Sequence, residues 1–366
     1  MKTFTFYSYK GGTGRSLLLA NAARYLALFE KRVVALDFDL EAPGLHFKFN
    51  IGPRGKRTAD EVPKRGAVDY LLAAADAGRP PRNLRDYVVA VPLPKGAEGS
   101  LHLMPAGSAP TGKYWKALTT LLGRNFFNDP EGSGLAACLE LKARIAEELK
   151  ADFLLIDART GVTELAGLTT TVFADKVVCL MLANRESQIG ARAVLRSLRH
   201  AARLPGQRAI AVIPVLSRVP ERDSFTAQET LSFLNEPGPT PEETLALKRV
   251  FVLRADPALA HSERLYVGCG EPEAQSPLHQ DYLALLAQLF EPNLIVALRA
   301  LPERDRRVLE LIYFNGLTYN EAAVALGISV STMRTLVVRA TRRLRKLLAE
   351  EREEVSASAR MQPSRP

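Results

Sequence analysis

The residues best suited to chemistry lie close to the start of the chain, in the stretch Tyr9-Lys10-Gly11-Gly12-Thr13-Gly14-Arg15-Ser16. Glycines let backbone N–H groups turn toward a polyphosphate, and a following helix adds free amides and its dipole. A serine hydroxyl at the helix start can also ligate Mg²⁺. A plain glycine-rich turn between a strand and a helix is the alternative. The pattern predicts a phosphate-binding loop whose nucleotide contacts come from Gly11, Gly12, Thr13, Gly14, Arg15 and Ser16.

Three carboxylates follow apolar, strand-like runs. One run leads to Asp37 and Asp39, and a later run leads to Asp157. In open α/β sheets the carboxyl ends of the strands face the ligand crevice, so we expect these side chains near the loop. Mg²⁺ needs only one or two protein oxygens, and we assign Ser16, Asp37 and Asp157 to its shell. Alternatively, acidic residues after a strand only cap the next turn or helix.

The loop departs from the standard P-loop, G-x-x-x-x-G-K-[ST], at two positions. Tyr9 stands where the first glycine belongs, and Arg15 replaces the loop lysine. A further basic residue, Lys10, opens the loop. A guanidinium keeps the positive charge and can clamp phosphate oxygens, but it is planar and bulkier than the ammonium of lysine. We therefore expect slow ATP hydrolysis.

The run Lys10-Gly11-Gly12-Thr13-Gly14, followed by a basic residue and a serine, resembles the deviant Walker A motif of the MinD/ParA family of P-loop ATPases. The segment that holds Asp39 resembles the second signature of that family. The resemblance implies ATP and Mg²⁺ as cofactors and a homodimer in the ATP-bound state. It implies two catalytic residues: Lys10, which reaches the nucleotide of the partner subunit, and Asp39, which orients the attacking water.

The segment after Asp157 is expected to act as a switch loop that senses the γ-phosphate. Arg159 in this segment has two possible partners, a phosphate group or the carboxylate of Glu164. The residues leave both interpretations open.

Strand-like and helix-like segments alternate up to residue 290. Such alternation predicts an α/β fold with a mostly parallel sheet and helices on both faces, as in P-loop NTPases. An amphipathic helix over 113–122 carries the single tryptophan, Trp115, which we expect to be packed rather than to bind a ligand. We place the ATPase domain at residues 1–290 and a short hinge at 291–293.

A separate signature begins at residue 294. Ten basic and four acidic side chains lie between 294 and 349, so six of the nine net positive charges are concentrated there. A short helix, a turn at Gly327 and a long basic helix from Val330 predict a small all-α helix-turn-helix domain over 294–349. The concentrated positive charge suggests nucleic acid as its partner. Residues 350–366 are expected to form a disordered tail.

This C-terminal segment resembles region four of sigma factors. The resemblance rests on the elements Leu-Pro-Glu-Arg, Gly-Leu-Thr, Glu-Ala-Ala and Leu-Gly-Ile-Ser and on the Arg-rich final helix. The resemblance implies a domain that reads promoter DNA, and RNA polymerase or another protein stays open as a further partner. A helical bundle used for dimerisation or for gripping a protein is the alternative. Arg334 is expected to read guanine, and the hydroxyls of Ser331, Thr332 and Thr335 to contact bases or phosphate. Arg339, Arg342 and Arg343 are expected to contact phosphates.

Length and composition are those of an ordinary globular protein. The chain has 366 residues, of which 47% are hydrophobic and 24% charged, which is enough for two domains. Its three cysteines lie far apart without metal-ligand spacing, so disulfides and structural zinc are not expected. We recognise neither a leader nor an apolar run that spans a membrane, and expect a cytoplasmic protein, with nucleoid association compatible with DNA binding.

Together these features predict an ATP-dependent dimerising switch that controls DNA binding by the helix-turn-helix. Such a switch would be a transcription or DNA-organising regulator that ATP hydrolysis resets. Two other functions stay open: a partitioning or positioning ATPase that uses DNA as a track, and a regulatory module of a bacterial defence or signalling system.

Overall fold

The structure, a computed structural model, divides the chain into two compact units, Met1–Leu265 and Tyr266–Pro366. The described residues are 1–49, 64–93, 98–128, 131–201, 209–220, 226–238, 240, 243–260, 264–268, 276–290, 297–298, 300–314 and 317–360. The predicted hinge at 291–293 lies outside them.

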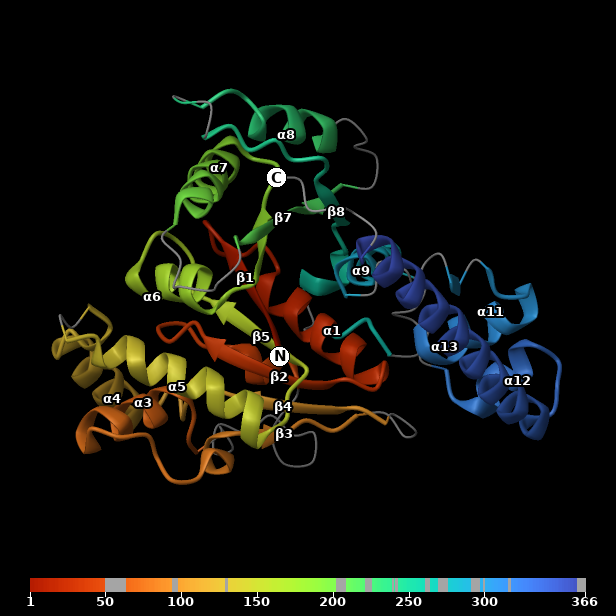
Figure 1. The fold of residues 1–366 in the computed structure, drawn as a ribbon, viewed down its shortest axis with the longest axis horizontal. Helices are drawn as coiled ribbons and strands as arrows, with labels where there is room; N and C mark the ends of the chain where they lie inside the picture. Colours follow the sequence, from red (N-terminus) through yellow and green to blue (C-terminus); the bar gives the residue numbers. More distant parts are fainter. Residues whose placement is uncertain are drawn as a thin grey trace. The chain divides into compact units, whose positions relative to one another are not determined.

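Eight strands of the first unit form one sheet in the order β3-β4-β2-β5-β1-β6-β7-β8 (Figure 1). All neighbouring strands are parallel except β3 and β4, which pair antiparallel at one edge. The central strands are nearly continuous apolar runs, as expected for strands buried on both faces. The strands are β1 Lys2–Ser8, β2 Arg32–Phe38, β3 Val89–Ala90, β4 Ser100–Met104, β5 Phe153–Ala158, β6 Lys176–Met181, β7 Ala211–Val219 and β8 Phe251–Arg254.

Helices cover both faces of this sheet (Figure 1). The longer helices are α1 Arg15–Leu28, α3 Ala67–Ala77, α4 Gly112–Gly123, α5 Ser133–Glu148, α7 Arg185–His200 and α8 Thr226–Leu234. The shorter segments are α2 Leu45–Lys48, η3 Leu84–Tyr87, η4 Phe126–Asn128, α6 Glu164–Gly167, η5 Leu168–Phe173 and η7 Pro257–Ala260. α1 packs on one face against β1, β2, β4 and β5, while α3, α4, α5 and α7 pack on the other. The predicted α/β fold class is confirmed.

The first strand, the loop and α1 follow directly from the residues that compose them. Leu and Ala dominate α1, and neither Gly nor Pro interrupts it. Its buried residues surround the helix rather than forming one stripe, which is typical of a helix enclosed in a core. A rigid α1 therefore fixes the position of the glycine loop that precedes it.

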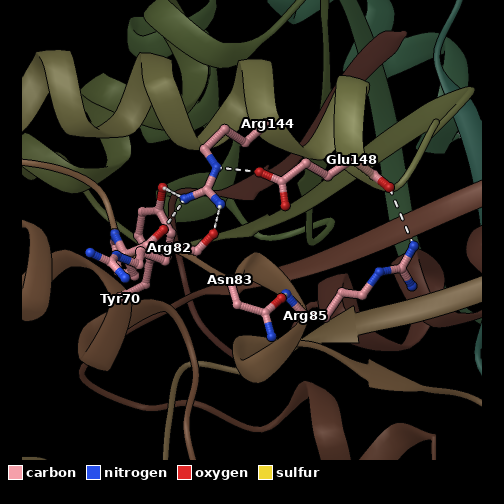
Figure 2. A network of polar contacts seen from close by, with 7 residues as sticks. Tyr70, Arg82, Asn83, Arg85, Arg144 and Glu148 are labelled. Carbon is pink, nitrogen blue, oxygen red and sulfur yellow. Dashed lines mark hydrogen bonds and ion pairs between the residues drawn. The ribbon is translucent and has the colours of Figure 1, made fainter.

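A buried arginine on α5 stabilises the part of this unit that lies away from the loop (Figure 2). The Arg144 guanidinium donates to the carbonyl oxygen of Pro81 at 2.5 Å and to that of Arg82 at 3.1 Å. It also donates to the hydroxyl of Tyr70 at 3.3 Å and pairs with the carboxylate of Glu148. The hydrogen bonds tie α5 to α3 and to the segment before η3, which is a structural role.

The second unit contains α9 Pro277–Phe290, α11 Glu303–Leu309, the π-helical segment η9 Glu310–Phe314, α12 Tyr319–Ala325 and α13 Val330–Arg360. We expected residues up to 290 to belong to the ATPase domain, yet α9 falls in the second unit. The segments α11, η9, α12 and α13 share one apolar core of Val308, Leu311, Ala322, Ala323, Met333, Leu336 and Val337. A small all-α domain with its own core is therefore present.

Local signals fix the ends of the helices in the helix-turn-helix. Thr318 and Glu321 form a capping box, in which each side chain accepts from the backbone N–H of the other residue, at the start of α12. Gly327 follows α12 with a φ of 62°, a left-handed conformation that glycine adopts without strain. The hydroxyl of Ser329 then accepts from the Thr332 N–H at the start of α13.

The end of α13 differs from the prediction. The helix runs to Arg360, through much of the segment that we expected to be disordered. The physical reason is composition, because Ala, Glu and Arg, which are good helix formers, dominate residues 349–354 and extend the helix. Residues 361–366 lie outside the described part of the chain.

No single helix among the described residues is long and apolar enough to cross a membrane. One pair, Tyr319–Ala325 with Val330–Leu344, reaches the required length and composition together but is bent by 98°. The apolar face of this pair forms the core of the helix-turn-helix.

Candidate nucleotide site and nucleic-acid interface

The glycine loop joins the end of β1 to the start of α1 and faces open space. Gly12 and Gly14 have φ values of 76° and 83°, which L side chains rarely adopt. A Cβ atom added at Gly11, Gly12 or Gly14 would meet nothing within 4 Å. Gly14 precedes α1, and no side chain caps that helix end. Backbone amides at a helix start with free space before them form a suitable cradle for phosphate.

Arg15, the first residue of α1, bridges two of the predicted carboxylates. Its Nε atom donates to Asp157 Oδ1 at 2.5 Å, and its Nη2 atom donates to Asp39 Oδ2 at 2.7 Å. Arg15 is 7% exposed and Asp157 is 1% exposed. Burial alone would lower the pKa of Arg15, but the carboxylates of Asp157 and Asp39 outweigh it and raise that pKa above its usual value. The guanidinium therefore stays charged.

Asp37 and Asp157 lie side by side because β2 and β5 are parallel neighbours that pair these two residues in register. Asp37 Oδ2 accepts from the backbone N–H groups of Gly44 at 3.2 Å and Leu45 at 3.0 Å. Its Oδ1 atom is buried and has no partner among the described residues. Burial raises the pKa of Asp37 well above its usual value, and the adjacent Asp157 carboxylate raises it further.

The pKa of Asp39 is also raised, mainly by burial, although Arg15 opposes the change. The ion pair with Arg15 therefore favours the charged form of Asp39. The site consists of one buried cation among three acidic side chains, and burial raises the pKa of two of them, Asp37 and Asp39.

The beginning of the loop contacts the start of α7. Lys10 Nζ lies 2.5 Å from Glu186 Oε1, an ion pair exposed to solvent. The ring of Tyr9 packs against Gly190, where an added Cβ would come within 2.0 Å of Tyr9 Cδ1. Tyr9, which occupies the position of the first P-loop glycine, thus anchors the loop to α7.

The predicted switch loop has a partner that the sequence did not indicate. Arg159 forms an ion pair with Glu41 rather than with Glu164. Glu41 lies just after Asp39, so the ion pair connects the segments that follow β2 and β5. The carbonyl oxygen of Gly161 accepts from the hydroxyl of Tyr7 at 3.0 Å, which ties the same loop to β1.

The loop, Asp37, Asp39 and Asp157 thus come together at one edge of the sheet, as the sequence predicted. Ser16 is half-buried at the start of α1, and Thr13 is buried with an Oγ1 atom that has no partner among the described residues. Within the described part of the chain, no three His, Cys, Asp or Glu side chains are grouped as a metal site. Of the predicted magnesium ligands, Asp157 gives its Oδ1 atom to Arg15, whereas Asp37 keeps a buried Oδ1 atom without a partner among the described residues. The assignment of Ser16, Asp37 and Asp157 to a magnesium shell stays a prediction.

The surface of α13 carries the residues that we predicted to contact DNA. Ser331, Thr332, Arg334, Thr335, Arg339, Arg342 and Arg343 are all exposed. The opposite face of the same helix, with Met333, Leu336, Val337, Ala340 and Leu344, is buried. Four arginines therefore project from one helix without contributing to the apolar core.

A buried acidic residue divides these arginines into two pairs. Asp305 on α11 is fully buried and accepts from Arg339 Nη2 at 2.6 Å and from Arg343 Nη1 at 2.5 Å. Burial opposes the charged form of Asp305, but hydrogen bonds from the two arginines outweigh it and lower its pKa. Arg334 and Arg342 form no ion pair with any residue that the structure describes.

The sequence analysis identified the basic residues but not the acidic residues with which they form ion pairs. It did not identify Glu186 opposite Lys10, Glu41 opposite Arg159, or Asp305. For Asp305 a signal existed, since it is spaced to lie on the same helix face as Val308 and Leu309, two apolar residues that are buried. A carboxylate on an apolar face needs a cation, and Arg339 and Arg343 of α13 supply two.

The comparisons with known proteins agree with this description. Residues 293–344 match the family model described as sigma-70, region 4. No curated protein matches the sequence of the chain.

The fold resembles three solved structures. The septum site-determining protein MinD of Pyrococcus horikoshii OT3, complexed with Mg-ADP, has a TM-score of 0.52 and 16% identity, with 80% of this chain and 96% of that chain covered. The cell division ATPase MinD of Pyrococcus furiosus has a TM-score of 0.50 and 18% identity, with 79% of this chain and 98% of that chain covered. Apo McdA of Cyanothece has a TM-score of 0.50 and 17% identity, with 79% of this chain and 99% of that chain covered. At such identities the likeness shows a shared fold. The predicted MinD/ParA-type fold joined to a sigma region 4 domain is confirmed.

Proposed function

We propose that this chain is an ATP-dependent switch that controls DNA binding by its sigma-region-4 domain. The observation that carries the proposal is the presence, in one chain, of a MinD/ParA-type fold with an open phosphate cradle and a helix-turn-helix with free arginines. The first unit would sense the nucleotide, and the second would bind the duplex.

The triphosphate of ATP would lie against the glycine loop, held by the backbone amides of residues 11–16 and by Arg15. Two features support this proposal: the open space before the three glycines and the buried cation at the start of α1. Bound ATP supplies a γ-phosphoryl group that water can attack, and Asp39 is the residue proposed to orient that water. Hydrolysis is expected to be slow, because Arg15 already engages Asp39.

The residues proposed to hold Mg²⁺ are Ser16, Asp37 and Asp157, and the buried Asp37 Oδ1 atom, which has no partner among the described residues, supports this assignment. Asp157 and Asp39 each give an oxygen to Arg15, and Asp37 turns one oxygen to two backbone amides. Bound Mg²⁺ would supply positive charge that neutralises the phosphates of ATP, while the residues of this chain bind and orient the nucleotide.

For DNA, the exposed face of α13 is the proposed surface. Arg334, near the start of the helix, is suited to read a guanine through two hydrogen bonds, whereas Arg342 is better suited to phosphate. The hydroxyls of Ser331 and Thr332 lie close to the helix start, where contacts to bases or phosphates are common. RNA polymerase is a further proposed partner, through the sigma region 4 match.

Coupling between the two units would come from dimerisation. Two subunits that bind ATP together would carry two helix-turn-helix domains, and the second domain would then bind DNA at a high effective concentration. Lys10 is the residue proposed to reach the nucleotide of the partner subunit.

The direct test is a fluorescence anisotropy titration of the full chain with a labelled duplex that the chain itself selects from a random-sequence library. We expect ATP to increase affinity by at least about tenfold, as avidity allows. Arg334→Ala should weaken binding to the selected duplex with and without ATP. Equal affinity in the presence and absence of ATP would contradict the coupling.

A control duplex of scrambled sequence separates this proposal from a partitioning or positioning ATPase. A regulator should prefer the selected duplex by a large factor, typically about 10³ or more. Binding that depends on duplex length but not on sequence would favour DNA as a track instead.

A further inference from the structure

One apolar side chain of α13 lies outside the core of its domain. Val338 is 66% exposed, whereas the neighbouring apolar residues Val337 and Ala340 are buried. Within the described part of the second unit, the only other exposed large apolar side chain is Val324 on α12. A β-branched residue also lowers helix propensity, so valine is a poor choice for a surface position that only has to be helical. A single exposed valine is common in proteins, and its neighbours decide whether it has a role.

The two free arginines of α13 lie on either side of Val338. Arg334 precedes it by four residues and Arg342 follows it by four, so the three side chains form one stripe along the helix. Neither arginine forms an ion pair with any residue that the structure describes. Arg339 directly follows Val338, but it lies about 100° further around the helix and is held by Asp305. The stripe is thus exposed, positively charged at both ends and apolar in the middle.

Thr335 adds to the apolar middle of this stripe. It lies three residues before Val338, on the same side of the helix. Its hydroxyl donates to the carbonyl oxygen of Ser331 at 3.1 Å, so this donor is used within α13. The hydroxyls of Ser331 and Thr332 lie 3.0 Å and 2.8 Å from the hydroxyl of Ser329. Local hydrogen bonds thus engage the three hydroxyls that we predicted to contact DNA, and the methyl group of Thr335 is available for apolar contact.

The major groove of DNA offers a partner for each part of the stripe. Guanine presents two acceptors that suit an arginine, and the phosphates suit a second arginine. The apolar group on a base edge in this groove is the C5-methyl group of thymine. A base contact at Val338 would also be continuous with the DNA contacts proposed for Arg334 and Arg342. Charge complementarity and position therefore favour DNA as the partner of this side chain.

We infer that Val338 reads thymine in the recognised DNA through contact with the C5-methyl group of that base. The inference deepens the proposed function and rests on it, since it concerns how α13 reads DNA. Four residues advance an α-helix by about 6 Å, and successive bases of one strand are about 3.4 Å apart along the duplex. The thymine should therefore lie within about two base pairs of the guanine that Arg334 reads.

The test uses the duplex that the full chain selects from a random-sequence library. Arg334→Ala locates the guanine, as the position at which this variant loses its base preference. Each thymine within about two base pairs of it is then replaced, one at a time, by deoxyuridine, which differs only in lacking the methyl group. For the natural sequence we expect one replacement to weaken binding about three- to fivefold in anisotropy titrations, the loss that corresponds to one buried methyl group.

Val338→Ala is the informative variant, because it should bind the thymine and deoxyuridine duplexes with Kd values that agree within about 1.5-fold. Val324→Ala is the matched control. It removes the same atoms from an exposed valine that follows Glu321 by three residues instead of lying between two arginines. The control should keep the full effect of deoxyuridine. Both variants replace an exposed residue by the best helix former, so we expect both to fold.

The outcomes separate the two proposals. A selected duplex without thymine near that guanine, or equal affinity of the natural sequence for every thymine and deoxyuridine pair, would overturn the role of Val338. DNA binding would stand, and a protein would be the better partner for this side chain. A deoxyuridine effect that persists in Val338→Ala would also overturn the role, because another side chain would then contact the methyl group. Binding without preference for any duplex sequence would overturn the sequence-specific switch, and the role of Val338 with it.

Discussion

At the scale of single residues, the balance of charges around Arg15 decides the chemistry of the loop. Asp39 and Asp157 are acidic groups in a buried environment, and Arg15 is the cation that holds both. The pKa of Asp37, next to Asp157, is raised by burial, which limits the number of full negative charges in the site. Arg15 therefore combines a structural and a binding role.

The structural role predicts that Arg15→Ala is strongly destabilising. Removing the guanidinium leaves two buried carboxylates without a cation, and such a change typically costs about 3–5 kcal/mol. Urea unfolding followed by circular dichroism, without nucleotide, measures the loss. Arg32→Ala is the control: its ion pair with Asp152 is exposed, so its loss should lower stability far less. Equal losses for both variants would contradict the role of Arg15.

Asp305 gives the second unit a defined dependence on pH. Its pKa is lowered in the folded chain by Arg339 and Arg343, relative to about 3.9 when unfolded. The stabilisation is thus fully present above the unfolded pKa and is lost as pH falls through the folded pKa. We expect amide hydrogen exchange in α11 and α13, corrected for intrinsic rates, to accelerate below about pH 4.

Asp305→Asn provides the control for this expectation. Asparagine cannot titrate, so the variant should show faster exchange in α11 and α13 at neutral pH and a smaller further change in acid. Glu310→Gln, which alters an exposed group 3.9 Å from Arg306, should leave both profiles unchanged. Identical acid responses of Asp305→Asn and the natural sequence would argue against the ion pairs as the cause.

At the scale of elements, α13 has an apolar face, a pair of arginines held by α11 and a pair that is free. The free pair is Arg334 and Arg342, and the held pair is Arg339 and Arg343. All four arginines are exposed, so exposure does not show which of them form an ion pair. The separation follows from Asp305, which lies on another helix.

Arg342→Ala should therefore act on DNA affinity alone. If Arg342 neutralises one phosphate, the slope of log K against log salt concentration should decrease in magnitude by about 1, with unchanged stability. Anisotropy titrations at several salt concentrations measure the slope. Arg343→Ala is the contrasting variant, since it should also weaken the packing of α13 on α11. An unchanged slope in Arg342→Ala would exclude a phosphate contact.

The contact between the loop and α7 allows a second prediction at this scale. Gly190→Ala would place a Cβ within 2.0 Å of Tyr9 Cδ1, close to the root of the ring, so the loop itself must shift. Overpacking of this kind costs about 1–3 kcal/mol, and affinity for mant-ATP, a fluorescent ATP analogue, should fall as well. Gly167→Ala is the control, because an added Cβ there meets nothing within 4 Å. A Gly190→Ala protein with unchanged affinity would show that Tyr9 does not position the loop.

At the scale of the whole molecule, the proposal that ATP brings two chains together depends on Lys10. In the single chain, Lys10 pairs with Glu186, and this exposed ion pair is easily exchanged for another partner. Lys10→Ala should abolish the ATP-dependent dimer, as measured by light scattering after size exclusion, while ATP binding to the monomer persists. Glu186→Gln should retain the dimer, because it removes only the partner within the chain. A Lys10→Ala protein that dimerises with ATP would refute the proposed role.

Much of the fold could be predicted because local signals and the global arrangement agree. The strand, loop and helix around Gly14 follow from apolar runs, glycines and an uninterrupted Leu- and Ala-rich segment. Predictions that depend on the orientation of a side chain were weaker. Trp115 was expected to be packed but is 42% exposed, while the adjacent Tyr114 is 2% exposed and takes the core position. One residue along a helix rotates a side chain by about 100°, which is enough to exchange core and solvent.

The sequence by itself determined the phosphate loop, the α/β class, the acidic residues at the strand ends and the basic helix of the second unit. These features depend on residue types and spacings that act within a few turns or one strand. Only the tertiary structure decided which charges meet: Arg15 with Asp39 and Asp157, and Arg339 and Arg343 with Asp305. The physical reason is that such pairs join residues distant along the chain, and only parallel strands in register or packed helices bring them within hydrogen-bonding distance.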